Sequence, residues 1–335
     1  MQKIVNIKVN SSDVIGSPKT KQNDKSRLKN WFDTISKIYI SILNYIGYKM
    51  PFEKVYFPFA YLEKVKRRGE NYTLKIILFD DFPLLLLAFS WQANNFILHG
   101  IGLIFLLTSF WCVYEIGYYE NDLVAEKYEQ KPKLASTYHD YKQMMETGYP
   151  WLWSLIFGFI GIVLLNKAQG IYLPFTILEA TIINPIILFF LSWTVFLICV
   201  RYCFKIYNYL NKQARTWLYL ILQSLRYYGF LWITSTNLIG ISILFSHILS
   251  RSLLYIVYRY SGGNSHNWPR ELPEKFLRFC IFIFLLITLC LGGGSLTLLQ
   301  SWQTWVILLW CAIRSQDQIR KTLSQFKPIF QDNSN

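Results

Sequence analysis

Residues 96–132 read FILHGIGLIFLLTSFWCVYEIGYYENDLVAEKYEQKP, an apolar run that ends in a cluster of acidic residues. The apolar part, 96–118, is long enough to cross the hydrocarbon core of a bilayer as a helix. The chain holds only 20 acidic residues in 335, yet five of them lie between 115 and 129. Carboxylates at the end of a membrane helix repel one another and are most easily held together by a divalent cation. The stretch therefore predicts a membrane helix with a metal site at its end.

The composition predicts the same kind of protein around this stretch. Hydrophobic residues make up 53% of the chain and charged residues 16%. Further apolar runs approach or reach the length of a membrane span, and a half-span at 170–182 is broken by Pro174. We expect an all-α integral membrane protein, a bundle of about eight or nine transmembrane helices. The predicted spans are roughly 76–93, 96–118, 151–168, 182–203, 216–235, 237–257, 276–297 and 299–313.

The remaining sequence flanks this transmembrane domain, which we place at 74–315. Residues 1–29 are polar and basic and predict a disordered tail. Within 30–73, apolar residues recur at helical spacing after Trp31, which predicts an amphipathic helix on the membrane surface; the alternative is a helix packed on a soluble core. Residues 316–335 form a C-terminal tail.

Lysine and arginine residues lie mainly on one side of the predicted spans. They gather before the first span and in every second loop, so the positive-inside rule places both termini and the acidic cluster on the cytoplasmic side. The net charge of +14 then reflects cytoplasmic loops and contact with anionic lipid. We find no nucleic-acid-binding pattern and expect the lipid bilayer as the main partner.

The acidic residues have helical spacing. Asp122, Glu126 and Glu129 lie at i, i+4 and i+7, and Glu115 precedes Asp122 by seven positions, so all four share one helix face. Asn121 adds a neutral oxygen ligand. Such hard oxygen ligands suit Mg²⁺, which commonly bridges to substrate phosphates. We also expect Asp122→Asn to relieve repulsion and leave the protein no less stable.

The alternative is that the cluster is a solvated helix end without a ligand. Its negative charges would then balance the neighbouring lysines, Lys127, Lys131 and Lys133. The position of Glu115 within the helix end, where solvent is scarce, favours the metal site.

With Asn121 and Asp122, the stretch resembles the UbiA superfamily of intramembrane prenyltransferases. That family carries the motif Asn-Asp-x-x-Asp-x-x-x-Asp in the cytoplasmic loop after its second helix. Here Glu129 occupies the last acidic position, whereas Ala125 replaces the middle aspartate beside Glu126. The resemblance is most specific over residues 74–133.

The resemblance implies two helical pseudo-repeats around a central cavity. It implies Mg²⁺-dependent transfer from a polyprenyl diphosphate, or onto a polyprenyl phosphate, with an acceptor that the sequence does not identify. Asp122 would be catalytic. The metal ligands would be Asn121, Asp122, Glu126 and Glu129, and the substrate contacts Asn121, Glu115, Tyr118, Lys127 and Arg226.

The family's second acidic motif is missing from this chain. Loop 204–215 has no acidic residue, and loop 258–275 has only Glu271 and Glu274. The alternative is therefore a catalytically inactive protein on the same scaffold that binds a lipid or a partner. A transporter is a third hypothesis, but the two halves lack matching broken helices.

Charged residues inside the apolar runs are further candidates. Arg226 lies within a predicted span, where it either clamps a phosphate, as a second catalytic residue, or pairs with a carboxylate such as Glu115. His247 is more typical of a hydrogen bond between helices than of a catalyst. Asp80 and Asp81 mark the start of the first span or line the mouth of the cavity.

Overall fold

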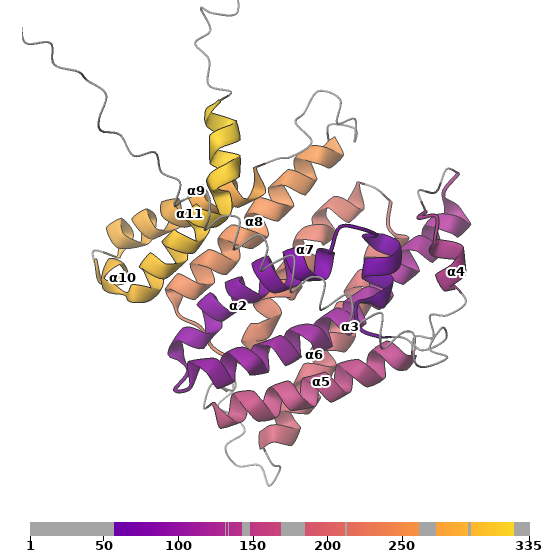
Figure 1. Cartoon of the computed structure of the whole chain (residues 1–335), viewed down its shortest axis with the longest axis horizontal. Coiled ribbons are helices and arrows are strands. Elements are labelled where there is room, and N and C mark those ends of the chain that lie inside the picture. The colour runs from indigo at the N-terminus through magenta and orange to yellow at the C-terminus, as the bar shows by residue number, and fades with distance from the viewer. Residues whose placement is uncertain are drawn as a thin grey trace, which may run out of the picture. The chain divides into compact units, whose positions relative to one another are not determined.

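Every regular element in the described part of the chain is helical (Figure 1). The computed structural model describes residues 57–130, 132, 134–142, 148–168, 185–211, 213–260, 273–293 and 296–324. The predicted tail at 1–29, the amphipathic helix after Trp31 and the half-span at 170–182 lie outside these residues. The elements are η2 (Leu62–Lys66), η3 (Thr73–Asp81), α2 (Phe82–Phe89), η4 (Ser90–Gln92), α3 (Phe96–Tyr128), α4 (Tyr138–Lys142), α5 (Gly148–Lys167), α6 (Pro185–Tyr209), α7 (Ala214–Tyr228), η6 (Gly229–Trp232), α8 (Leu238–Tyr260), α9 (Glu274–Gly292), α10 (Thr297–Gln300) and α11 (Trp302–Leu323).

Five of these helices are long and apolar enough to cross a membrane: α3, α5, α6, α8 and α9. The all-α fold and the multi-pass membrane character are thereby confirmed. Exposed large apolar side chains on α5, α6 and α9 are consistent with lipid contact, among them Phe159, Leu191 and Phe284.

The other predicted spans differ from a single apolar helix. Residues 76–93 fall in three consecutive short elements, η3, α2 and η4, and residues 216–235 fall in α7, which has 15 residues, and η6. The predicted span 299–313 lies largely in α11, which continues to Leu323 and carries Arg314, Arg320 and Lys321 in its second half. Within the described residues, the count of spans by length and apolarity is therefore five and not eight or nine.

The junction between η4 and α3 follows from local sequence. The Asn95 side chain accepts a hydrogen bond from the Leu98 amide at 3.0 Å, which caps the first turn of α3. Pro83 lies where α2 continues η3 without a break, and it cannot donate a backbone hydrogen bond to the preceding turn. Residues 93–95 separate η4 from α3, and α2 packs against α3.

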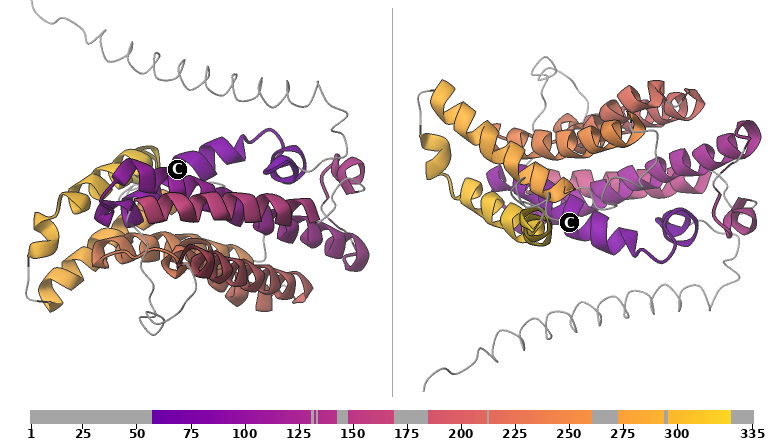
Figure 2. Two further views of the ribbon diagram at one scale, coloured as in Figure 1. Left: turned by 90° about the horizontal axis from the view of Figure 1, so that it is seen from below. Right: turned by 90° about the horizontal axis from the view of Figure 1, so that it is seen from above.

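Helix α3 is the centre of one group of helices and packs along α5 and α6 (Figure 2). Small residues allow the backbones of α3 and α5 to approach: a Cβ added to Gly161 would lie 3.0 Å from the Gly102 carbonyl oxygen. The Ser109 and Ser154 hydroxyls each donate to the other's carbonyl, at 2.7 and 2.8 Å. Small residues and hydroxyls are the usual means of close helix packing in membranes.

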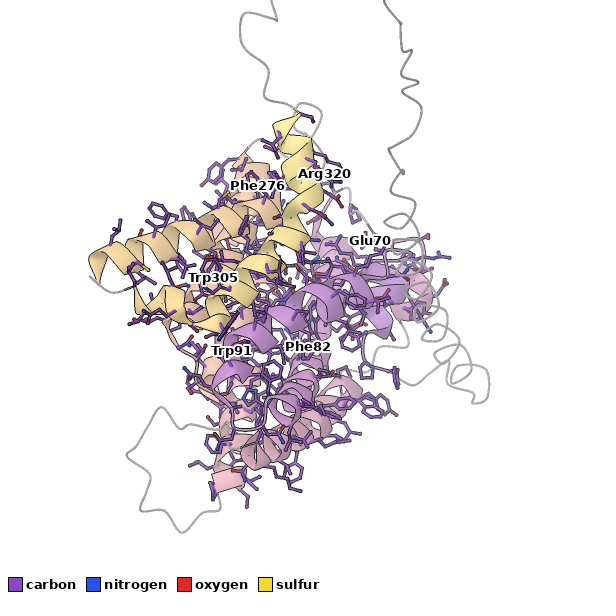
Figure 3. The ribbon with its side chains drawn as sticks, turned by 60° about the vertical axis from the view of Figure 1, so that its left-hand side comes forward. Glu70, Phe82, Trp91, Phe276, Trp305 and Arg320 are labelled. Atoms are coloured by element: carbon purple, nitrogen blue, oxygen red, sulfur yellow. The ribbon has the colours of Figure 1, made fainter. Side chains whose placement is uncertain are left out.

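Helix α8 is the centre of a second group and packs against α2, α7 and α9. Figure 3 shows α9 and α11, labelled at Phe276 and Trp305, side by side. The start of α11 is tied to α2, because the Gln303 amide donates to the Leu87 carbonyl at 2.9 Å. Asp80 and Asp81, the last two residues of η3, lie among α7, α8, α9 and α11 and contact an arginine from each of these helices.

Candidate functional site

The acidic end of α3 begins with Glu115, whose side chain is fully buried. Its carboxylate accepts hydrogen bonds from the backbone amides of Phe59, at 2.9 Å, and Leu62, at 2.7 Å. Phe59 has a φ of 68°, a left-handed conformation that is strained for an aromatic residue. Glu115 thus caps the turn that leads into η2 and offsets the strain of its backbone.

Asp122, seven positions after Glu115 on α3, binds the same segment, residues 57–66. Its carboxylate accepts a hydrogen bond from the Tyr61 hydroxyl at 2.8 Å and forms an ion pair with Lys66 at 2.5 Å. Only 4% of Asp122 is exposed. Burial, and then the Asp122 carboxylate, raise the pKa of Tyr61 far above its usual value, so this phenol stays protonated at neutral pH and donates a hydrogen bond.

The other acidic residues of the cluster pair with different segments. Glu126 accepts hydrogen bonds from Tyr138, at 2.8 Å, and Lys142, at 2.7 Å. Burial and this hydrogen bond raise the pKa of Tyr138. Glu129 lies 4.0 Å from the Arg215 guanidinium. The carboxylates therefore share one end of α3, as their spacing predicts, while each binds its own donors.

Glu120, the remaining acidic residue of the stretch, links α3 to α6, a contact that was not predicted from the sequence. It accepts from Arg201 of α6 at 2.8 Å and from the Asn208 amide at 3.2 Å. The available signal was an acidic residue and an arginine at the ends of two apolar runs, 96–118 and 182–203.

The predicted substrate contacts at this end of α3 lie in different environments. Tyr118 belongs to an aromatic cluster and stacks on Trp111, with ring centroids 6.5 Å apart. Lys127 is exposed, and its ammonium lies 5.2 Å from the Tyr128 ring. Asn121 is partly exposed.

Arg226 is buried, and its partner is Asp81 rather than Glu115, the carboxylate considered from the sequence. The guanidinium donates to Asp81 and lies 4.5 Å from the centre of the Trp111 ring. Tyr227 also donates to Asp81, at 2.8 Å. The sequence could not identify this pair, because 145 positions separate its members.

Asp80 is shared by three arginines, each from a different helix. Arg278 lies 3.3 Å, Arg314 3.4 Å and Arg251 3.7 Å from its oxygens. Arg251 also binds Glu274, at 2.7 Å, and lies 3.5 Å from Asp81. We define Asp80, Asp81, Arg226, His247, Arg251 and Arg278 as the arginine cluster.

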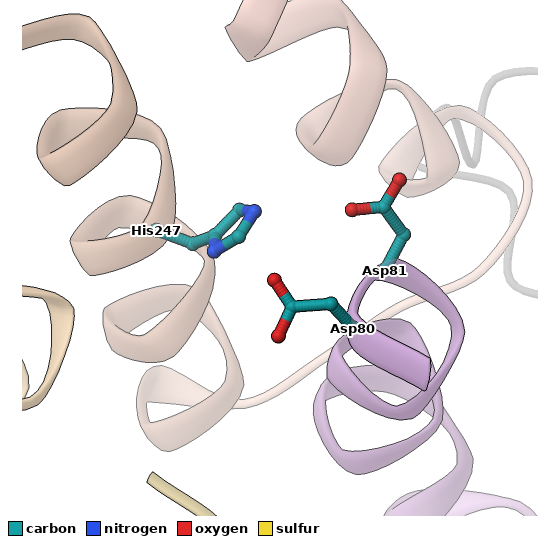
Figure 4. Close-up of side chains that lie close together, drawn as sticks. All are labelled: Asp80, Asp81 and His247. Atoms are coloured by element: carbon teal, nitrogen blue, oxygen red, sulfur yellow. The ribbon is translucent and has the colours of Figure 1, made fainter. Parts of the chain in front are cut away.

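His247 completes this cluster (Figure 4). Its Nδ1 lies 2.9 Å from the Arg278 guanidinium, which is always a donor, so Nδ1 carries the lone pair and Nε2 carries the proton. The Arg278 guanidinium also stacks over Trp310, 4.3 Å from the ring centre. The signal for these residues in the sequence was a charge inside an apolar run: Arg278 lies in the predicted span 276–297 as Arg226 does in 216–235.

Asp80, Asp81 and His247 also have the composition of a metal site. One ligand atom from each lies within 4.8 Å of the other two, and all three residues are buried. The surrounding charges disfavour a cation, because the two carboxylates contact four guanidinium groups. The His247 nitrogen that holds a lone pair is also taken by Arg278. No residue of the acidic end of α3 belongs to a metal-ligand group of this kind within the described residues.

No protein-family model, curated protein or solved structure matches this chain.

Proposed function

We propose that this protein is a UbiA-like membrane transferase that acts on a phosphorylated isoprenoid with Mg²⁺. The observation that carries the proposal is the Asn121–Asp122 pair at the end of the long apolar helix α3, with Glu126 and Glu129 on the following turns. The substrate would be a polyprenyl diphosphate, or a polyprenyl phosphate that receives another group. The proposal does not specify the acceptor.

The lysines beside these carboxylates are compatible with a diphosphate substrate. Lys66 and Lys142 carry flexible side chains, and an ammonium that pairs with a carboxylate can turn to a phosphate oxygen. Asp122 and Glu126 would then be available to Mg²⁺, which bridges carboxylates and phosphates. In this proposal Lys66 and Lys142 neutralise the carboxylates of the free protein and the diphosphate of the complex.

We also propose the number of membrane spans and the location of the termini that the sequence predicts. The segments η3–α2–η4, α7–η6 and α11 would add three spans to the five apolar helices. The resulting eight spans, of the eight or nine expected from the sequence, would surround a central cavity. Both termini would be cytoplasmic, as the distribution of lysine and arginine favours.

A catalytically inactive protein that binds a lipid or a partner is the second candidate. The observation that favours it is the pairing of each carboxylate at the end of α3 with its own partners, together with the missing second acidic motif. On this hypothesis the acidic residues only hold segments 57–66 and 134–142 and helix α6 against α3.

Binding of geranylgeranyl diphosphate to the purified full chain separates the two candidates. The transferase should bind it with Mg²⁺ and lose binding with EDTA, and Asp122→Asn should weaken binding by about 10- to 100-fold, since a charge-assisted contact is lost. Asp317→Asn, an exposed charge change on α11, is the matched control. Equal binding with and without Mg²⁺, unaffected by Asp122→Asn, would favour the inactive protein.

A further inference from the structure

The buried charges of the arginine cluster do not balance. The side chains of Arg226, Arg251 and Arg278 are at most 9% exposed, and those of Asp80 and Asp81 at most 1%. Three buried guanidinium groups therefore face two buried carboxylates. At the partly exposed rim, Glu274 binds Arg251 at 2.7 Å, and Arg314 adds a further guanidinium 3.4 Å from Asp80. In all, four guanidinium groups face three carboxylates. An uncompensated positive charge inside a protein is costly, so the cluster is short of one negative charge.

The cluster is also short of hydrogen-bond acceptors. Three buried donor atoms, Arg226 Nε, Arg278 Nε and His247 Nε2, have no hydrogen-bond partner among the described residues. One buried acceptor of the cluster, Asp80 Oδ2, also has none there, so the unpartnered donors outnumber the unpartnered acceptors by three to one. The contacts of Asp80 with its three arginines, 3.3–3.7 Å, are longer than the roughly 2.7–2.9 Å of a good charge-assisted hydrogen bond. One carboxylate is thus divided among three guanidinium groups and satisfies none of them fully.

We propose that the arginine cluster binds a phosphate group, carried by a lipid or present as the free ion. A phosphate supplies both the negative charge and several acceptor oxygens, and guanidinium groups match its geometry. Arg226, Arg251, Arg278 and His247 would donate to it. This site is separate from the acidic end of α3 and does not depend on the proposed transferase activity.

The partly exposed rim of the cluster is formed by residues of α9 and α11, and we take it as the entry side. Arg314 and Glu274 lie there with side chains 27% and 33% exposed, next to the partly exposed Lys275. Lys275 and Arg314 attract an anion towards the cluster, and Glu274 already occupies one face of Arg251. A lipid that reaches the cluster from the bilayer surface would leave its acyl chains against the apolar faces of α9 and α11.

Two probes test the proposal on the full chain in a phosphate-free maltoside detergent. Native mass spectrometry measures retention of dioleoyl phosphatidic acid, with the matched dioleoylglycerol as the neutral lipid. Isothermal titration calorimetry measures inorganic phosphate. We expect saturable binding of one phosphate group and no retention of dioleoylglycerol. Binding of phosphatidic acid alone identifies a lipid as the source, and binding of inorganic phosphate identifies the free ion.

Two variants that change the charge of the cluster in opposite directions distinguish a phosphate-binding site from a purely structural network of ion pairs. Arg278→Gln should weaken binding by about 10- to 100-fold, because it removes a charged donor. Asp80→Asn should strengthen binding several-fold, because it removes the competing carboxylate. Arg259→Gln, on the same helix as Arg251 but paired with Tyr255, should leave binding unchanged. If Arg278→Gln does not fold, Asp80→Asn still decides by the sign of its effect.

Absence of binding of both probes to the parent chain would overturn the proposal. So would a folded Arg278→Gln with unaltered binding, or an Asp80→Asn that binds more weakly than the parent. Phosphate binding that survives Asp122→Asn without Mg²⁺ would support the site even if the transferase proposal fails.

Discussion

Glu115 and Asp122 lie about two turns apart on α3, and each carboxylate holds part of segment 57–66. Glu115 satisfies two backbone amides, and Asp122 satisfies Tyr61 and Lys66. From the sequence we expected repulsion among these carboxylates, because the chain gives no indication of which bases face them. In the structure each acidic residue has donors of its own. Removal of one charge therefore breaks a favourable contact rather than relieving an unfavourable one.

Asp122→Asn should lower the free energy of unfolding by about 1–3 kcal/mol, as expected for loss of a hydrogen-bonded charge pair. The asparagine still accepts from Tyr61, so the loss comes from the Lys66 ion pair. Thermal or denaturant unfolding in detergent measures it. In a double-mutant cycle with Lys66→Met, the double variant should be less destabilised than the sum of the single variants. An Asp122→Asn protein more stable than the parent would restore the repulsion hypothesis.

At the scale of elements, the interface between α3 and α5 depends on glycine. Gly161 and Gly102 face each other, and an added Cβ at Gly161 would also lie 2.9 Å from Leu106. The Gly102 carbonyl cannot move without disturbing the backbone of α3. The interface therefore tolerates no larger residue at these positions, although both helices would form with alanine.

Gly161→Ala should destabilise the protein by about 1–3 kcal/mol, the usual cost of overpacking. Gly292→Ala, near the end of α9, is the matched control, because nothing lies within 4 Å of its added Cβ. Unfolding of the two variants side by side measures the difference. Equal stabilities would mean that the interface between α3 and α5 adjusts to an added methyl group at no cost.

At the scale of the whole molecule, positive charge predicts the sidedness of the chain. Lysine and arginine precede the first predicted span and recur in alternate loops. The acidic end of α3 is hydrogen-bonded to segment 57–66, so we expect these two parts of the chain on one side of the membrane. The proposed even number of spans would return the C-terminus to that side.

Cysteine labelling tests this sidedness with Ser12→Cys and Asn333→Cys. Both should react with a membrane-impermeant maleimide only after the cells are permeabilised, because the cytoplasm encloses them. The parent chain, whose six cysteines react to whatever extent they are accessible, gives the background. Labelling of only one of the two positions in intact cells would contradict an even number of spans.

The sequence by itself determined the all-α membrane character and the position of the acidic helix end, because apolar length and helical spacing are local properties. The span α3 and the shared position of Asp122, Glu126 and Glu129 at its end were predictable in this way. Only the tertiary structure decided the partners. Arg226 meets Asp81, and Arg278 meets Asp80 across 198 positions, because distant helices bring these charges together where water cannot solvate them. Such pairing depends on helix packing, which no local pattern encodes.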